Sequence, residues 1–129
     1  MKDETRVWLS YSEENFKAAQ LLLERNIYNP CLQNIQQSIE KALKSILLEK
    51  SHCYRKTHSI TELVHLLANQ QIAISLSEED CDLLDSIYLP SKYPLGGVLP
   101  DFEPDASLCQ HCLMLAEEVI SQVRKVVGR

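Results

Sequence analysis

The side chains best suited to chemistry lie in one polar run and in the histidine that follows it. Five polar residues of the run recur at helical spacings: Gln36, Gln37, Glu40, Lys41 and Lys44. They would share the polar side of a helix. Amide groups can hydrogen-bond the edges of bases, and lysines can contact phosphates. The run is therefore a candidate nucleotide or RNA surface, and a solvated helix face is the alternative interpretation.

His58 follows this run, where the next helix is expected to begin. An imidazole changes its charge near neutral pH, so His58 could act as a general base or donate a hydrogen bond to a phosphate. Its alternative role is structural, as a residue that supports or packs against the helix start. Arg55 precedes it with two residues between them. In a nuclease, Arg55 could stabilise the charge that develops on phosphorus.

A third candidate feature is the group formed by Tyr88, Lys92 and Tyr93. Two aromatic rings beside one cation could stack a base and neutralise a phosphate. The alternative is that both tyrosines pack a loop against the rest of the protein. Pro90 is expected to interrupt the helix that would otherwise place Tyr88 and Lys92 on one face.

The segment from Cys109 to Cys112 resembles a metal or redox motif, because its two thiols share a helical face and His111 lies between them. Structural zinc normally takes four ligands, and the other cysteines show no second paired spacing. We therefore expect buried, inert thiols, with no metal and no cofactor. The odd total of five cysteines also argues against a secreted disulfide framework.

These residues would be positioned by helices, since the first 95 residues contain no glycine. We expect a first helix over about residues 4–25 and a second that starts near Pro30, with Asn29 as its cap. A third would be capped by Thr57 or Ser59. A fourth, capped by Ser77, would end at Pro90 and Pro94, before a long loop over 92–104. The fifth would run from just after Asp105 to about Val127.

Apolar residues with helical periodicity predict the core. In the first helix they are Trp8, Tyr11, Phe16, Ala19, Leu22 and Leu23. The second helix has the clearest pattern in the chain: Leu32, Ile35, Ile39, Ala42, Leu43, Ile46 and Leu47. The predicted fold is therefore an all-α, up-and-down four-helix bundle with an additional shorter helix, in which the second helix is central.

Size and composition limit the function further. The chain has 129 residues, 45% of them hydrophobic and 24% charged, which predicts one globular domain over 1–129. Its net charge of −5 disfavours broad binding to duplex nucleic acid, although a local basic patch is compatible with it. The apolar runs are too short to cross a bilayer and no signal segment is evident, so we expect a cytoplasmic protein.

Several motifs, taken in order, resemble the HEPN domain family over nearly the whole chain. They are Trp8 with Ala18-Ala19 and Leu22, Tyr28-Asn29-Pro30, Gln36-Gln37 followed by Glu40-Lys41 and Lys44, Thr57-His58, and Tyr88 with Lys92-Tyr93-Pro94. Members of this family are small all-helical proteins found as toxin or antitoxin partners and as companions of minimal nucleotidyltransferases. The resemblance thus implies a homodimer and a separately encoded nucleotidyltransferase partner.

The chain departs from the family pattern at two points. Similar members have Arg-Tyr-Pro where this sequence has Lys92-Tyr93-Pro94, and lysine lacks the bidentate fork that arginine offers to phosphate. The ribonuclease branch has an arginine followed by a histidine after four to six residues. Only two residues separate Arg55 from His58, so the nuclease signature is absent.

Three functions follow from these residues. The first is a nucleotide- or RNA-associated interaction module without catalysis of its own, whose binding residues are Gln37, Lys41, Lys44, His58, Tyr88, Lys92 and Tyr93. The second is a metal-independent endoribonuclease that uses His58 as general base, with Arg55 or Lys92 at the phosphate. The third is a helical scaffold without a ligand.

Overall fold

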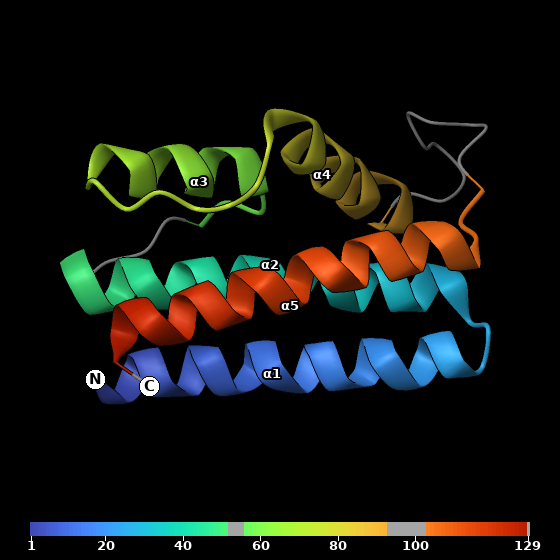
Figure 1. Cartoon of the computed structure of the whole chain (residues 1–129), viewed down its shortest axis with the longest axis horizontal. Coiled ribbons are helices and arrows are strands. Elements are labelled where there is room, and N and C mark those ends of the chain that lie inside the picture. The colour runs from blue at the N-terminus through green and yellow to red at the C-terminus, as the bar shows by residue number, and fades with distance from the viewer. Residues whose placement is uncertain (52–55, 93–102, 129) are drawn as a thin grey trace.

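A computed structural model describes residues 1–51, 56–92 and 103–128, apart from the side chains of 89–92. These residues form five helices and no strand, which confirms the predicted all-α class (Figure 1). The helices are α1 (Asp3–Glu24), α2 (Tyr28–Ser51), α3 (Ile60–Asn69), α4 (Glu78–Lys92) and α5 (Ala106–Val127). Within the described part of the chain, none of these helices has both the length and the apolar character needed to span a membrane.

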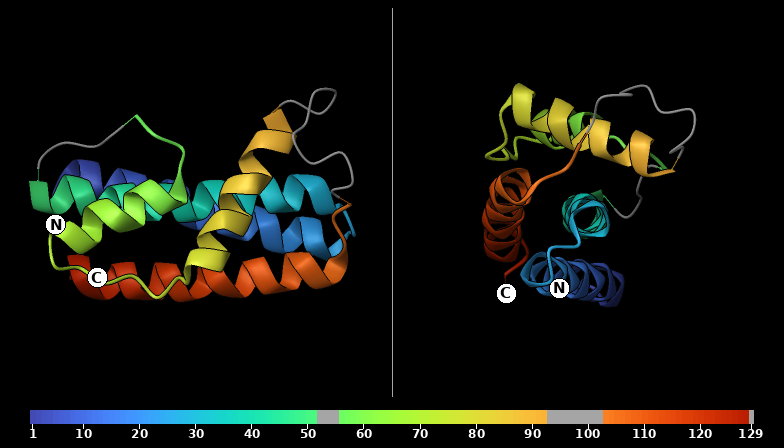
Figure 2. Two further views of the ribbon diagram at one scale, coloured as in Figure 1. Left: turned by 90° about the horizontal axis from the view of Figure 1, so that it is seen from above. Right: turned by 90° about the vertical axis from the view of Figure 1, so that its right-hand side faces the viewer.

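The three long helices α1, α2 and α5 lie side by side along the long axis of the molecule (Figure 1). Helices α3 and α4 lie on the opposite side of α2 from α1, and α4 crosses the long helices obliquely (Figure 2). Helix α2 contacts each of the other four helices. This position explains why 14 of its 24 residues are buried, and it confirms the prediction that the second helix is central.

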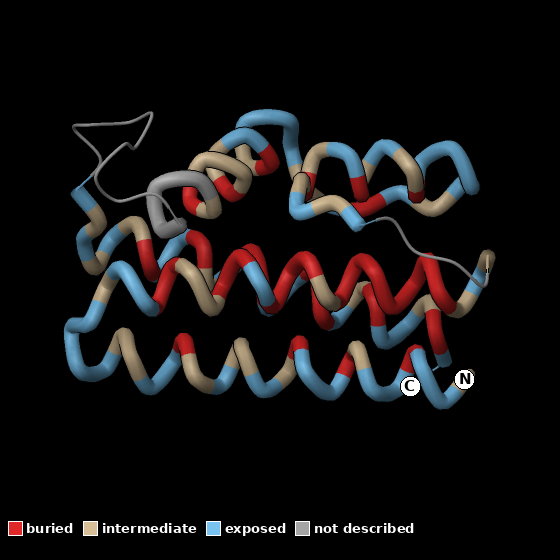
Figure 3. The backbone as a smooth tube through the Cα atoms, turned by 180° about the vertical axis from the view of Figure 1, so that it is seen from behind, coloured by how far each residue is buried: buried red, intermediate tan, exposed pale blue. Residues whose placement is uncertain are grey.

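The core is built around α2. All seven of its predicted apolar positions are buried, and six of them are fully inaccessible to solvent. Figure 3 shows the buried positions concentrated along the inner helices, whereas the outer face of α1 is mostly exposed. Removing a leucine or isoleucine side chain from water contributes about 1.5–3 kcal/mol, so this helix provides a large share of the folding free energy.

The predicted inner face of α1 was partly wrong. Tyr11 is 51% exposed, and the fully buried positions instead include Leu9, Thr5 and Ser12. The Ser12 hydroxyl donates to the Ser38 carbonyl at 2.6 Å, and the Thr5 hydroxyl donates to Glu49 Oε1 at 3.0 Å. These short side chains satisfy their hydrogen bonds against α2 and let the two helices approach closely. An apolar pattern alone could not reveal an interface that uses hydroxyl groups.

Two predicted helix boundaries need correction. Helix α2 begins at Tyr28 rather than near Pro30, so Asn29 lies inside its first turn and is not the cap. Pro30 still lies in the first turn, where its missing N–H has no partner to lose. Helix α4 continues through Pro90 to Lys92. A proline near the end of a helix removes one backbone hydrogen bond, and the helix can continue for the last two residues despite this loss.

The predicted caps of α3 and α4 are confirmed by their hydrogen bonds, and the structure adds a cap for α5 that was not predicted. Ser59 Oγ accepts from the Glu62 N–H at 3.1 Å, and Ser77 Oγ accepts from the Asp80 N–H at 3.0 Å. At α5, Asp105 Oδ1 accepts from the Leu108 N–H at 2.8 Å. Each contact satisfies one of the backbone donors that a helix leaves free at its N-terminus.

The cysteines within the described residues are buried, as expected for thiols used as small apolar side chains. Burial raises the pKa of Cys81 to about 11 and the pKa of both Cys109 and Cys112 to about 12. A raised pKa keeps the thiol protonated at neutral pH, and the thiolate is the reactive form. The His111 side chain is 45% exposed, and its Nε2 lies 3.2 Å from Asp80 Oδ1. Cys53 lies outside the described residues.

Candidate functional site

An open groove with a volume of about 710 Å³ lies between α2 and the segments that flank it. One side comes from Trp8 of α1, and the other comes from the 56–58 segment and from Tyr88 of α4. Helix α2 forms the floor. The lining residues are Trp8, Gln33, Gln36, Gln37, Glu40, Lys41, Lys44, Lys56, His58 and Tyr88.

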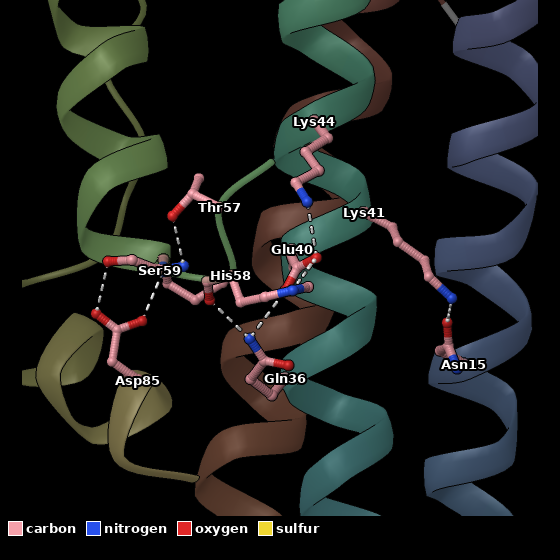
Figure 4. Close-up of polar contacts among 10 residues, drawn as sticks. Asn15, Gln36, Glu40, Lys41, Lys44, Thr57, His58, Ser59 and Asp85 are labelled. Atoms are coloured by element: carbon pink, nitrogen blue, oxygen red, sulfur yellow. Dashed lines mark hydrogen bonds and ion pairs between the residues drawn. The ribbon is translucent and has the colours of Figure 1, made fainter. Parts of the chain in front are cut away.

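Glu40 lies at the centre of the polar network in the groove (Figure 4). Its Oε2 accepts from Lys44 Nζ at 2.9 Å, and its Oε1 accepts from Gln36 Nε2 at 3.3 Å. The side chains of Glu40 and Lys44 are only 8% and 4% exposed. Such a buried ion pair is stable only when both charges are well matched by neighbours. The network therefore fixes these side chains in position.

His58 completes the network from the segment before α3. Its Nδ1 lies 3.2 Å from Glu40 Oε1 and 3.3 Å from Oε2. A carboxylate can only accept, so Nδ1 holds the proton and, in the neutral ring, Nε2 is left as an acceptor. The ring stacks on Tyr88 with centroids 4.7 Å apart and an interplanar angle of 16°. His58 remains 52% exposed and can reach a ligand in the groove.

The start of α3 is held by Asp85 of α4. Asp85 Oδ1 accepts from the Ile60 N–H at 2.6 Å, and Oδ2 accepts from the Thr61 hydroxyl at 2.7 Å. Oδ2 also accepts from Ser59 Oγ at 3.1 Å and from the Thr61 N–H at 3.3 Å. A second contact holds the backbone of this segment: Gln36 Nε2 donates to the His58 carbonyl at 3.1 Å.

Lysines give the groove its electrostatic character. Lys41 Nζ donates to Asn15 Oδ1 at 2.8 Å and lies 5.8 Å from the centre of the Tyr11 ring. Lys44 Nζ lies 5.7 Å from the centre of the Trp8 ring. With Lys56, the groove has three lysines and one carboxylate, in a chain whose net charge is −5. The groove is therefore a local basic patch with aromatic rings beside its cations.

The structure brings together five of the residues predicted from sequence as a binding site. Gln37, Lys41, Lys44, His58 and Tyr88 all line the groove, although they come from three separate segments. Arg55 and Tyr93 lie outside the described residues, and so does the side chain of Lys92.

The environment of four residues differs from the prediction, and a further residue, Asp85, was missed. Gln36, Glu40 and Lys44 were predicted on the polar side of the second helix, yet they are 1%, 6% and 3% exposed. Trp8 was predicted to be a core residue, and it is a groove residue. The spacing of four residues between Glu40 and Lys44 was a signal for their ion pair. No local signal identified Asp85, because its partners are more than 20 residues away.

Chemically, the groove is suited to an anion that also has a planar group. Its lysines can offset negative charge, and its rings can stack against an aromatic base. Within the described residues, no three His, Cys, Asp or Glu side chains are grouped closely enough to hold a metal ion.

Comparison with a family model and with solved structures shows which proteins this chain resembles. A family model described as HEPN domain matches residues 5–126. The crystal structure of TT1696 from Thermus thermophilus has a TM-score of 0.67 and 25% sequence identity, covering 97% of this chain and 99% of that one. The crystal structure of an archaeal HEPN homologue has a TM-score of 0.64 and 19% identity, covering 98% and 99% of the two chains. No curated protein sequence matches this chain. Because the family model matches almost its full length, the chain belongs to the HEPN domain family.

Proposed function

We propose that this HEPN protein is a nucleotide- or RNA-associated interaction module, and that the groove on α2 is its binding site. The main support is the local excess of positive charge: the groove has three lysines and one carboxylate, Glu40, in a chain with a net charge of −5. Trp8 and Tyr88 add aromatic rings to the same groove. Lysines beside aromatic rings suit a phosphate that is attached to a base.

The proposal includes a protein partner. Family membership favours a homodimer that acts with a separately encoded minimal nucleotidyltransferase in a toxin-antitoxin-like pair. In this arrangement the chain binds the nucleotide or RNA and contributes no catalytic step of its own. A small nucleotidyltransferase encoded in the adjacent reading frame would support the partnership.

The binding proposal can be tested by titrating the purified protein with ATP and with a short single-stranded RNA. We expect Lys41→Ala and Lys56→Ala each to weaken binding by about five- to tenfold, because a contact between a lysine and a phosphate contributes roughly 1 kcal/mol. Affinity should also fall as salt rises, since such contacts release counterions. Calorimetry or fluorescence anisotropy at two salt concentrations would measure both effects.

Lys50→Ala is the matched control, since it removes the same charge from an exposed position at the end of α2 that does not line the groove. It should bind like the parent. Lys92→Ala tests the prediction made from sequence for that lysine. If neither ligand binds the parent, or if all four variants bind equally well, the groove is not a nucleotide site. In that case the ligand-free scaffold becomes the better description.

The contact between Glu40 and His58 favours one alternative, a metal-independent endoribonuclease. A carboxylate on Nδ1 orients the imidazole and leaves Nε2 free to take a proton from a ribose 2′-hydroxyl. The hydroxyl oxygen would then form a bond to the adjacent phosphorus as the bond from phosphorus to the 5′-oxygen breaks. The 5′-oxygen would leave with a proton taken from water, and a 2′,3′-cyclic phosphate would remain. A lysine of the groove would stabilise the negative charge that develops on the phosphate.

Incubation with single-stranded RNA in the presence of a chelator tests this alternative. Cleavage that disappears in His58→Gln would establish the enzyme. An intact RNA after prolonged incubation with the parent protein would leave the binding module as the function.

A further inference from the structure

The side chains that hold His58 in place come from two helices, α2 and α4. On α2, Glu40 contacts its ring and Gln36 contacts its backbone carbonyl. On α4, Tyr88 stacks on the ring, and Asp85, one turn earlier, binds the three residues that follow His58. Figure 4 shows Asp85 and Glu40 on opposite sides of the segment that contains His58. The orientation of the ring therefore depends on the position of α4 as well as on its contact with α2.

We propose that Asp85 is a positioning residue for the groove: by holding residues 59–61 against α4, it aligns the imidazole of His58 with Glu40 and Tyr88. The arrangement of acceptors supports this role. The two Asp85 oxygens accept from two backbone N–H groups and two hydroxyl groups of Ser59, Ile60 and Thr61. An ordinary cap is provided locally, because Ser59 Oγ already accepts from the Glu62 N–H. Asp85 adds a tertiary contact to a helix start that already has its own cap.

The proposal has a geometric reason. His58 directly precedes Ser59, so a displacement of Ser59 moves the His58 backbone with it. The ring stacks on Tyr88 of α4 and contacts Glu40 of α2, so its position depends on both helices. Supporting contacts of this kind decide whether a functional side chain keeps its geometry. Asp85 and Tyr88 are three residues apart on α4, so one helix sets both the anchor of the segment and the ring against which His58 stacks.

Nuclear magnetic resonance of His58 in the ligand-free protein tests the proposal directly. In the parent, the imidazole nitrogens should show the tautomer with the proton on Nδ1, and the ring protons should be shifted upfield by the Tyr88 stack. Comparison with His58→Gln assigns the signals. In Asp85→Asn, one acceptor oxygen becomes a donor that faces other donors, so we expect the upfield shift to be lost and both tautomers to be populated.

Asp82→Asn is the matched control, because it removes the same charge from an exposed position on the same helix. It should leave the His58 signals unchanged. Thr61→Val, which removes a single hydrogen bond to Asp85, should give a smaller change in the same direction. Thr61→Val also gives an answer if Asp85→Asn fails to fold. His58 signals that are identical in the parent and in the folded Asp85 or Thr61 variants would show that Asp85 only stabilises the helix start.

The consequence for ligand affinity rests on the proposed function. If ATP or a short RNA binds in the groove, Asp85→Asn should weaken binding by roughly tenfold, although Asp85 does not line the groove. A tenfold loss of affinity corresponds to about one hydrogen bond. The two proposals can fail separately. Lack of binding by the parent removes the proposed function and leaves the resonance test valid. Unchanged affinity together with unchanged His58 signals in the variant removes the role of Asp85.

Discussion

Glu40→Gln is expected to lower the free energy of unfolding by about 3 kcal/mol, because breaking a buried ion pair leaves a charge without its matched partner. Glu40 and Lys44 are 8% and 4% exposed at their side chains, so water cannot readily replace the lost carboxylate. The glutamine has nearly the same shape, and the loss therefore reports charge rather than volume. Urea denaturation followed by circular dichroism would measure it.

A double-mutant cycle separates the ion pair from other effects of the substitution. Lys44→Met should also destabilise the protein, and the variant with both substitutions should be more stable than the sum of the single changes predicts.

Asp3→Asn is the control, because it breaks an ion pair with Arg6 in which the Asp3 side chain is 98% exposed. Exposed pairs contribute little, so this control should unfold at the same urea concentration as the parent. A loss in Glu40→Gln no larger than that of the control would show that the pair is not significant for stability.

Leu43→Ala is expected to destabilise the fold by about 3 kcal/mol and to lower the melting temperature by about 10 °C. Leu43 is fully buried on α2, the helix that contacts all four others. Truncating it removes the transfer free energy of three carbons and leaves a cavity between helices that cannot fully close. Thermal unfolding monitored by circular dichroism would measure the change.

Leu21→Ala is the matched control for this second prediction, since Leu21 lies on α1 with 56% of its surface exposed. The same chemical change there should shift the melting temperature very little. Equal effects at the two positions would contradict the view that α2 is the centre of the core. Because Leu43 does not line the groove, any Leu43→Ala protein that remains folded should still bind the groove ligand.

The two predictions concern the two sides of one helix. The apolar side of α2 provides most of the core, and its polar side provides the floor of the groove. Glu40 and Lys44 belong to both, because they are buried like core residues and lie beside the residues available to a ligand. Substitutions at these positions should therefore change stability and binding together. Lys41 and Lys56 are better suited to tests of binding alone.

The sequence by itself determined the helical class, the caps of α3 and α4, and the inner face of α2. These features depend on contacts within a few residues: apolar side chains at spacings of three and four, and a cap that accepts from the N–H three residues later. The same local patterns also indicated the HEPN family. They identified Gln37, Lys41, Lys44, His58 and Tyr88 as binding candidates without showing how these residues meet.

Only the tertiary structure decided which polar residues form the groove and what holds them. Glu40 and Lys44 belong to one helix, but their partners include distant residues: Glu40 contacts His58, 18 residues further along the chain, and Lys44 lies beside the Trp8 ring of α1. The tertiary structure also decided which face of α1 packs on α2. The hydroxyl groups of Thr5 and Ser12 can be buried because acceptors on α2 satisfy them. The burial of a polar group depends on a distant partner, and helical periodicity contains no information about that partner.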